Sequence, residues 1–330
     1  MRTAGAGATL GLAVLLAAGC SAEPDGGRGP AAVATTASST APPSATTTAA
    51  PPESPAPAPA PRRVRPADFR VGTATAAVEH LAGRIGPRHA TSAAYAEAVR
   101  WVAGRLRDLG YRVHRQRVLV PGGSSWGVPV EAGTSVNVVA RLPGTDLRRP
   151  HLLVGAHLDT VPQAPGAEDN ASGVGVLLAA AEAAAERRTR LPVVFVAFGA
   201  EEPRGPTDAD HHYGSRAYVA ALGPTERRAV RGMVSLDRVG VGAVVPVGSA
   251  TPGGDPAQRA VLAAAGRAGV PVVAEANHSS DHWSFVRAGL PGVRLGSTPY
   301  AGYHSPADVP AVVEPAQLRR TGRVLLAWLR

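Results

Sequence analysis

Acidic side chains stand directly after an apolar run in the middle of the chain. Residues 191–198 (LPVVFVAF) carry no polar side chain, which is typical of a strand buried on both faces. The run soon reaches two adjacent glutamates, Glu201 and Glu202. Carboxylates are rarely buried without a partner. A strand that ends on two adjacent carboxylates therefore raises the question of which partners hold them there.

The same arrangement recurs elsewhere in the chain. The segments HLLVGAHLD, GAEDNASG, GMVSLD and AGYHSPAD carry His157, Asp159, Asp169, Asp237, His304 and Asp308. Each residue alone has an ordinary explanation, such as a core histidine, a helix cap or a turn. Together they offer nitrogen and oxygen donors without a thiolate, a set that suits zinc or a harder divalent ion.

The elements that must position these residues alternate between strand and helix patterns. Strands are expected at 111–120, 136–142, 151–157, 193–198, 232–236 and 292–295. Helices are expected at 73–85, 91–109, 173–187, 214–221, 256–268 and 315–329. This alternation predicts an α/β fold, a three-layer α/β/α sandwich with a mixed, largely parallel central sheet. Ligands of such folds collect at the carboxyl ends of the strands, where the donors lie.

At this point the residues resemble a known family. The series GAHLD, GAEDNASG, GAEE, SLDRVG, SSDHWSF and YHSPAD is similar to the co-catalytic zinc aminopeptidases of family M28, and it follows the order of that family's motifs. The resemblance implies two Zn²⁺ ions per chain. By it, His157 and Asp237 would bind one ion, Glu202 and His304 would bind the other, and Asp169 would bridge them.

The resemblance also implies roles for residues that do not bind metal. Glu201 matches the family's general base, and Tyr303 matches a tyrosine that helps to hold the tetrahedral intermediate. Asp159 would orient the ring of His157. Asp281, in SSDHWSF, would support the site from behind the ligands, with a helix-capping role as its alternative.

The expected reaction is removal of N-terminal residues from peptides with a free N-terminus. A metal-bridged hydroxide would attack the carbonyl, and Glu201 would take the proton and pass it to the leaving amine. Two alternatives remain open. One is a glutaminyl-cyclase-like aminoacyltransferase that uses a single zinc, although such enzymes typically carry Trp where this chain has Tyr303. The other is a non-catalytic binding domain on the same fold, although such relatives usually lose ligands.

Two features depart from the family pattern. Residues 203–213 (PRGPTDADHHY) are longer than the family's usual turn, and His211 and His212 are expected in a polar loop at the rim of the cleft rather than on an extra ion. Arg238 follows Asp237, where relatives usually carry an apolar residue. An arginine that faced the site would repel the terminal ammonium of a substrate, and strand alternation is expected to point it away.

The N-terminus resembles a bacterial lipoprotein signal. An apolar stretch at residues 4–18 is short for a spanning helix, which needs ~20 residues. The run LAAGC then resembles a lipobox that ends on Cys20, with an ordinary secretory signal as the alternative. Residues 1–20 are expected to be the signal, 21–66 a disordered tether rich in Pro, Ala, Thr and Ser, and 67–330 the peptidase domain. The protein would then be exported and anchored by lipid to the extracytoplasmic face of the membrane.

Composition adds limits. The chain has 330 residues, a net charge of +9 and no lysine, and its arginines are scattered, so nucleic acid is not expected as a partner. Cys20 is the only cysteine, so no disulfide can form within the chain.

Overall fold

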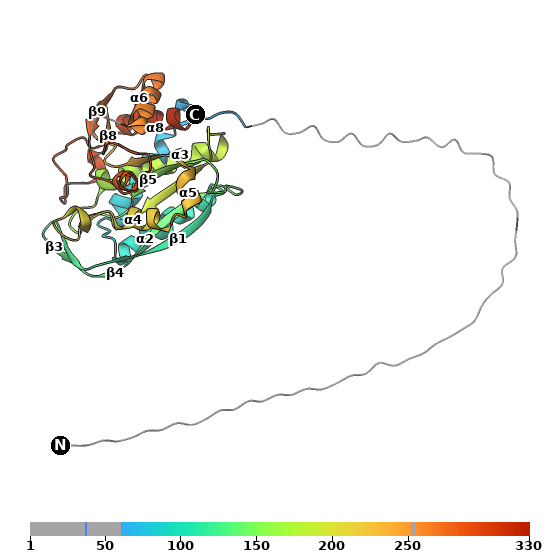
Figure 1. Ribbon diagram of the computed structural model, residues 1–330. Coiled ribbons are helices and arrows are strands. Elements are labelled where there is room, and N and C mark those ends of the chain that lie inside the picture. The colour runs from blue at the N-terminus through green and yellow to red at the C-terminus, as the bar shows by residue number, and fades with distance from the viewer. Residues whose placement is uncertain (1–36, 38–60, 252–254) are drawn as a thin grey trace, which may run out of the picture. The chain divides into compact units, whose positions relative to one another are not determined.

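The computed structural model describes residue 37 and residues 61–251 and 255–330 (Figure 1). The expected signal, Cys20 and most of the expected tether lie outside the described residues. The packed region begins earlier than predicted, because Val64 is buried and its N–H donates to the carbonyl of Arg188 at 3.0 Å. The expected boundary at residue 67 is therefore a few residues late, since one apolar side chain at the end of this Pro- and Arg-rich stretch docks on the domain.

A mixed eight-stranded sheet forms the centre, in the order β1-β4-β6-β5-β7-β10-β8-β9. The strands β6, β5, β7 and β10 are parallel neighbours, whereas β1 pairs with β4, β4 with β6 and β8 with β10 in antiparallel fashion. The bounds are β1 (Arg112–Val120), β4 (Gly133–Arg141), β5 (His151–His157), β6 (Val193–Phe198), β7 (Val230–Leu236), β8 (Val245–Ser249), β9 (Val272–Ala276) and β10 (Gly292–Leu295). The predicted mixed, largely parallel sheet is confirmed.

The sequence prediction missed β8, β9 and a separate hairpin of β2 (Gly123–Ser125) and β3 (Val128–Val130). Strand β8 reads VPVGS, and its proline and glycine are residues that strands disfavour. Strand β9 lies at the edge of the sheet with its residues partly or fully exposed, so it lacks the continuous apolar run of a central strand.

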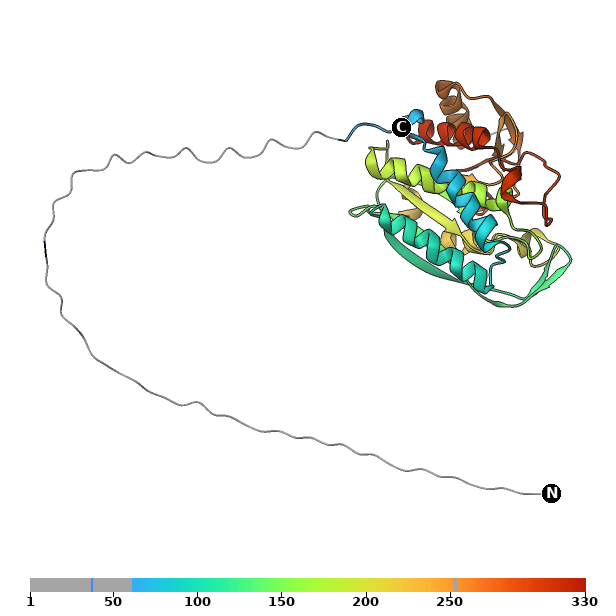
Figure 2. The same cartoon turned by 180° about the vertical axis from the view of Figure 1, so that it is seen from behind.

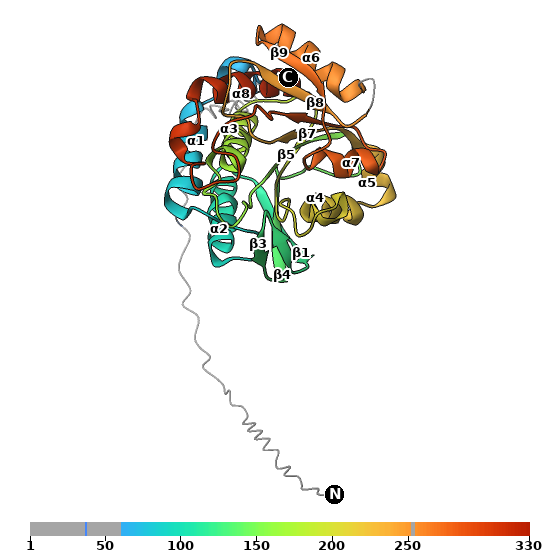
Figure 3. The same cartoon turned by 90° about the vertical axis from the view of Figure 1, so that its left-hand side faces the viewer.

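Helices cover both faces of the sheet. Helices α1, α2, α3 and α8 lie on one side, and α4, α5 and α7 lie on the other (Figure 3). The view from behind shows the first group in front of the sheet (Figure 2). The bounds are α1 (Val71–Val78), which continues as a π-helical turn (Glu79–Ile85), α2 (Ala93–Asp108), α3 (Gly173–Glu186), α4 (Tyr213–Ala221), α5 (Pro224–Ala229), α6 (Pro256–Ala268), α7 (His282–Arg287) and α8 (Pro315–Leu329).

Capping residues explain why several helix bounds were predictable. Helix α6 starts after Asp255, whose carboxylate accepts the N–H of Gln258, and it ends before Gly269 in the left-handed conformation. Helix α2 starts after Ser92, whose hydroxyl accepts the N–H of Tyr95. Helices α5 and α7 were not predicted, since each has only six residues. No helix in the described part of the chain is long and apolar enough to span a bilayer.

Strand β6 shows how the core fixes the position of the site. Val194, Val196 and Phe198 pack into the apolar cluster on the side of α4 and α7. Phe195 and Ala197 pack into the cluster on the side of α1, α2 and α3. Both faces of the strand are therefore buried, and the chain leaves the sheet with Glu201 and Glu202 at the edge where the parallel strands end.

Candidate active site

The carboxyl ends of the parallel strands deliver the predicted donors to one cavity of about 200 Å³. His157 ends β5, and Asp237 directly follows β7. Glu201 and Glu202 follow β6. Asp169 comes from the turn that leads into α3, and His304 comes from the loop after β10. All of these residues line the cavity, so the structure brings together every residue that the resemblance implied as a metal ligand.

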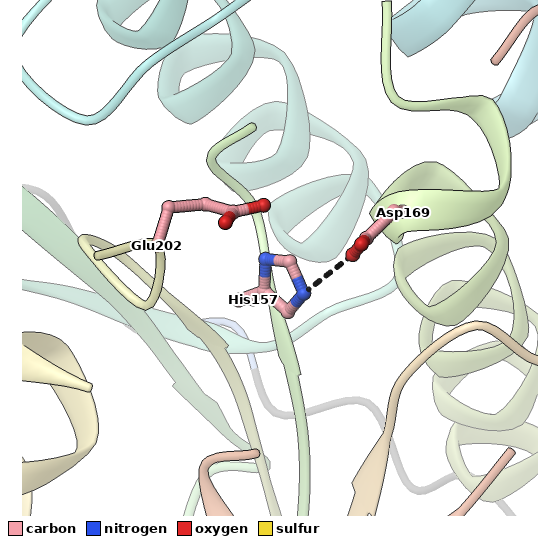
Figure 4. A group of neighbouring side chains, drawn as sticks. All are labelled: His157, Asp169 and Glu202. Atoms are coloured by element: carbon pink, nitrogen blue, oxygen red, sulfur yellow. Dashed lines mark ion pairs between the residues drawn. The ribbon is translucent and has the colours of Figure 1, made fainter. Parts of the chain in front are cut away.

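Asp169 lies between the two histidines. Its Oδ1 is 3.1 Å from Nε2 of His157, and its Oδ2 is 3.0 Å from Nε2 of His304. Figure 4 shows His157, Asp169 and Glu202 with their polar ends turned toward one another, although they come from separate segments. One carboxylate thus offers a separate oxygen to each of two imidazoles, which is the arrangement of a bridging ligand.

Two further carboxylates complete one group around each histidine. Asp237 Oδ1 is 3.7 Å from Nε2 of His157, and Glu202 Oε2 is 3.7 Å from Nε2 of His304. Ligand atoms ~2.1 Å from a tetrahedral ion lie roughly 3.4 Å apart. The spacing of 3.0–3.7 Å among these donors therefore matches the spacing of atoms around a shared ion.

The electrostatics of the group also fit a cation. Burial, together with the negative charge of Asp169, raises the pKa of Glu202 well above its usual value. Burial opposes ionisation of Asp237 as well, but the charges of Arg294 and His157 hold the pKa of Asp237 below its usual range. Oε1 of Glu202 and Nδ1 of His304 are buried without a hydrogen-bond partner among the described residues. The donor set therefore fits bound zinc.

Comparisons with known proteins agree with this geometry. The model of "Peptidase family M28" matches residues 137–329. The chain belongs to peptidase family M28. It is 31% identical over 174 residues to the uncharacterized protein YfbL of Escherichia coli, and this alignment covers 47% of this chain and 51% of YfbL. It is 34% identical over 108 residues to aminopeptidase YwaD of Bacillus subtilis, and this alignment covers 32% of this chain and 22% of YwaD. The chain thus spans about half of the first relative and less of the second.

Solved structures share the fold of this M28 chain. A zinc aminopeptidase from Bacillus subtilis, BSAP, superposes with a TM-score of 0.70 at 19% identity, covering 79% of this chain and 94% of that one. A glutaminyl cyclase from Bacteroides thetaiotaomicron superposes with a TM-score of 0.65 at 20% identity, covering 79% of this chain and 97% of that one. At these identities the likeness establishes the shared architecture.

Asp159 lies beside the ring of His157 and also contacts the two glutamates. Nδ1 of His157 is 3.2 Å from the backbone carbonyl of Asp159 but 3.8 Å from its carboxylate. The carboxylate also accepts the backbone N–H groups of Glu201 at 3.1 Å and Glu202 at 3.2 Å. The carbonyl therefore orients the histidine ring, while the side chain fixes the two glutamates at the end of β6.

Glu201 has a partner that the sequence reading placed only at the rim. Its Oε1 is 3.1 Å from Nε2 of His212, and its backbone carbonyl accepts the N–H of His212 at 2.9 Å. Burial opposes the charge of Glu201, but His157 and His212 lower the pKa of this carboxyl. The 203–213 segment thus lines the cavity as expected through Asp208 and His211, and it also supports Glu201. Neither histidine belongs to a metal-capable group in the described residues.

Arg238 faces the cavity, so the expectation that strand alternation points it away is wrong. Strand β7 ends at Leu236, and Arg238 adopts a left-handed backbone with φ of 54°. The left-handed turn reverses the direction that a further strand residue would have had. The guanidinium carbon lies 4.4 Å from the ring centre of Tyr303, and both residues line the cavity.

Tyr303 lines the cavity, whereas Asp281 is not among its lining residues. Tyr303 is 38% exposed, and its ring stacks on that of His304 with the ring centres 3.7 Å apart. Burial raises the pKa of Tyr303, so its hydroxyl stays protonated and can donate. Asp281 is fully buried, and burial together with the charge of Glu201 raises its pKa to about 7. Its side chain makes no capping bond to α7, which removes the capping alternative.

Two further residues support the site: Arg294, which the sequence reading missed, and Asp308, which it named only as a candidate donor. Arg294 is fully buried, and its Nη2 lies 3.1 Å from Oδ1 of Asp237. An arginine inside the apolar strand GVRL was a signal that could have revealed it. The carboxylate of Asp308 accepts hydrogen bonds from the backbone N–H groups of Glu168 at 2.8 Å and Asp169 at 3.1 Å. These contacts fix the turn that presents Asp169.

Residues with a left-handed backbone conformation cluster at this site. The described non-glycine residues with positive φ are Trp126, Ala200, His212, Arg238, Ser297 and His304. Most of them line the cavity; of the others, Ala200 precedes Glu201, and Ser297 accepts a hydrogen bond from Arg238. Such conformations are costly and persist where surrounding contacts impose them, often at functional sites.

Proposed function

We propose that this M28 protein is a dizinc aminopeptidase that removes N-terminal residues from peptides. The observation that carries the proposal is Asp169, which offers one oxygen to His157 at 3.1 Å and the other to His304 at 3.0 Å. A carboxylate divided in this way between two imidazoles has the arrangement that a ligand shared by two ions requires. His157 and Asp237 would hold one ion, Glu202 and His304 the other, and Asp169 both.

Each remaining group has a distinct part in the proposed reaction. Zinc would supply Lewis acidity, which lowers the pKa of bound water and polarises the scissile carbonyl. Glu201 stays available to take a proton from the attacking water and to deliver it to the leaving amine. His212 keeps the Glu201 carboxylate in place. The hydroxyl of Tyr303 would donate to the oxygen on which negative charge develops.

The test combines metal content with substrate requirements. The purified full-length chain would be loaded with zinc, its zinc content measured, and its hydrolysis of aminoacyl-nitroanilides compared with that of acyl-blocked analogues. Two zinc ions per chain and cleavage of the free-amine substrates alone would support the proposal. One zinc per chain with cyclisation of N-terminal glutamine peptides would support the cyclase alternative. Zinc binding without either reaction would support the non-catalytic alternative.

We also propose that the protein is exported and anchored by lipid on Cys20. The support is the sequence alone, the LAAGC motif and the Pro-, Ala-, Thr- and Ser-rich segment that follows it. In the native host, Cys20→Ala should prevent lipidation, so the enzyme should be released or accumulate as an uncleaved precursor. Mature Cys20→Ala protein that stayed firmly on membranes would contradict the anchor, and the wild type in the same fractionation is the control.

A further inference from the structure

The cavity contains one guanidinium whose hydrogen-bonding capacity is mostly unused. Arg238 donates from Nη2 to the hydroxyl of Ser297 at 2.9 Å, and its Nε and Nη1 donate to no residue that the structure describes. Nε is 3.9 Å from Oδ1 of Asp237, which is too long for a hydrogen bond. Only 14% of the side chain is exposed. A largely buried cation with free donors normally has a partner, and here the free donors belong to a residue that lines the cavity.

Arg238 is held firmly in this orientation. Its backbone N–H donates to Oδ1 of Asn170 at 3.3 Å, and its carbonyl accepts the N–H of Ser297 at 2.9 Å. The guanidinium lies over the ring of Tyr303, a cation–π contact that restrains its plane. A positioned guanidinium loses little freedom when it binds a ligand, so its geometry favours recognition rather than a mobile surface charge.

The negative charge around Arg238 is already taken by other partners. Asp237 lies at ion-pair distance from Arg238, 3.9 Å, but its closer partner is the buried Arg294 at 3.1 Å. The carboxylates of Asp169, Glu202 and Asp237 would balance zinc in the loaded site. Apart from Glu201, the other carboxylate of the cavity wall is Asp208, which lies exposed on the 203–213 segment. The charge of Arg238 therefore stays available to a substrate.

We infer that Arg238 binds a carboxylate of the substrate, so that the preferred peptides carry a carboxylate close to the scissile bond. This carboxylate has two possible sources: the side chain of an N-terminal Asp or Glu, or the free C-terminus of a dipeptide. The free donors of Arg238 can meet both oxygens of a carboxylate side by side. A neutral peptide would bring only its ammonium, which Arg238 repels. This inference rests on the proposed aminopeptidase function.

Kinetics on matched substrates test the inference and separate the two sources. The zinc-loaded full-length chain would be given Glu- and Leu-nitroanilide in one arm, and Leu-Gly and Leu-Gly-amide in the other. The wild type should prefer the carboxylate-bearing member of at least one pair. Hydrogen bonds to charged groups contribute enough that Arg238→Met should lower this preference in kcat/KM by about 10- to 100-fold, chiefly through KM. Arg238→Lys keeps the positive charge but lacks the paired N–H donors of the guanidinium, so it should show more of the preference than Arg238→Met does.

Equilibrium binding supplies a readout that does not depend on turnover. The same peptides would be titrated into Glu201→Gln and into Glu201→Gln/Arg238→Met, with zinc content and melting temperature measured for both. Carboxylate-bearing peptides should bind more weakly to the double variant by a similar factor, whereas the neutral member of each pair should not lose affinity. If Arg238→Met binds less zinc or has a lower melting temperature than the wild type, Arg238→Gln takes its place in both experiments.

Several outcomes would overturn the inference. They are a wild type that prefers Leu-nitroanilide and Leu-Gly-amide, an equal effect of Arg238→Met on all four substrates, and carboxylate binding that is independent of Arg238. Failure of the aminopeptidase proposal looks different. In that case no substrate is hydrolysed, while the titrations still show whether Arg238 binds the carboxylate.

Discussion

The two walls of the cavity are built by different means. The strand-end wall, His157, Glu201, Glu202 and Asp237, follows the carboxyl ends of three parallel strands and is almost fully buried. The loop wall comprises Trp126, His212, Arg238, Tyr303 and His304; all of these except Tyr303 have left-handed φ, and Trp126 and Tyr303 are exposed. The difference indicates that the sheet positions most of the proposed metal ligands and Glu201, whereas loops with left-handed backbone add His304 and the surrounding residues of the cavity.

The two walls also differ in the effect that a substitution is expected to have on activity. In the strand-end wall, His157 and Asp237 lie 3.7 Å apart and every residue is buried, so a change there alters either a proposed zinc ligand or the proposed base. The loop residues contact one another mainly through rings, Arg238 over Tyr303 and Tyr303 over His304. Substitutions in the strand-end wall should therefore abolish turnover or reduce it strongly. In the loop wall, a change of His304 should do the same because it is a proposed zinc ligand, whereas changes of the other loop residues should have smaller effects.

The largest effect is expected at the carboxylate that joins the two walls. Asp169→Ala should reduce activity to background, since both zinc ions would lose a ligand. Chelation of the wild type should also lower its melting temperature, because metal that binds only the native state stabilises it. The measurements are zinc content, turnover and thermal melting. The control is Asp208→Ala, because Asp208 also lines the cavity but is not a proposed metal ligand. Unchanged activity and melting after full chelation would rule out the zinc model.

The next effect separates the adjacent glutamates of the strand-end wall. Glu201→Gln should retain zinc, yet kcat should fall by ~10²–10⁴, the usual contribution of a positioned proton-transfer group. Glu202→Gln should lose zinc from one site, because a neutral amide is a poorer ligand, and excess zinc should restore part of the rate. The measurement is zinc per chain beside kcat. The opposite pattern of zinc loss would exchange the two roles.

A smaller effect is expected where the loop wall supports the strand-end wall. His212→Gln should retain zinc but lower kcat by roughly 10-fold, since a charge-assisted contact to Glu201 is lost. His212 helps to lower the pKa of Glu201, so its removal should raise that pKa. The acidic limb of the kcat profile should then move to higher pH. His211→Gln is the matched control, and equal pH profiles for both variants would show that His212 does not tune Glu201.

The smallest effect is expected at the exposed edge of the loop wall. Trp126 is 54% exposed, and its ring lies edge-on to His304 with the ring centres 4.3 Å apart. Trp126 also lines the cavity, and an aromatic contact with a substrate would contribute ~0.5–1.5 kcal/mol, so Trp126→Ala should raise KM by about 2- to 10-fold and leave zinc content intact. Leu119→Ala, an exposed apolar change away from the cavity, should leave KM as it is. Zinc loss in Trp126→Ala would show that Trp126 also supports His304, the proposed zinc ligand beside it.

The sequence by itself determined the elements that carry regular patterns. Apolar runs such as 193–198 predicted the buried strands, because a strand covered on both faces needs an apolar side chain at every position. The bounds of α6 and α8 were also predictable from spacing and capping. The same logic placed His157, Glu201, Glu202 and Asp237 at one edge, since parallel strands end together.

Only the tertiary structure decided how residues beyond the strand ends are oriented and paired. Arg238 turns into the cavity because Ser297 and Asn170 hold its backbone left-handed, and neither is near it in sequence. Asp159 was predicted to be a partner of His157; its carboxylate lies 3.8 Å from that ring, and it also accepts hydrogen bonds from the amides of Glu201 and Glu202, which the sequence did not reveal. Strand periodicity constrains side-chain direction only while the strand lasts. Beyond its end, direction depends on contacts between segments that no local pattern encodes.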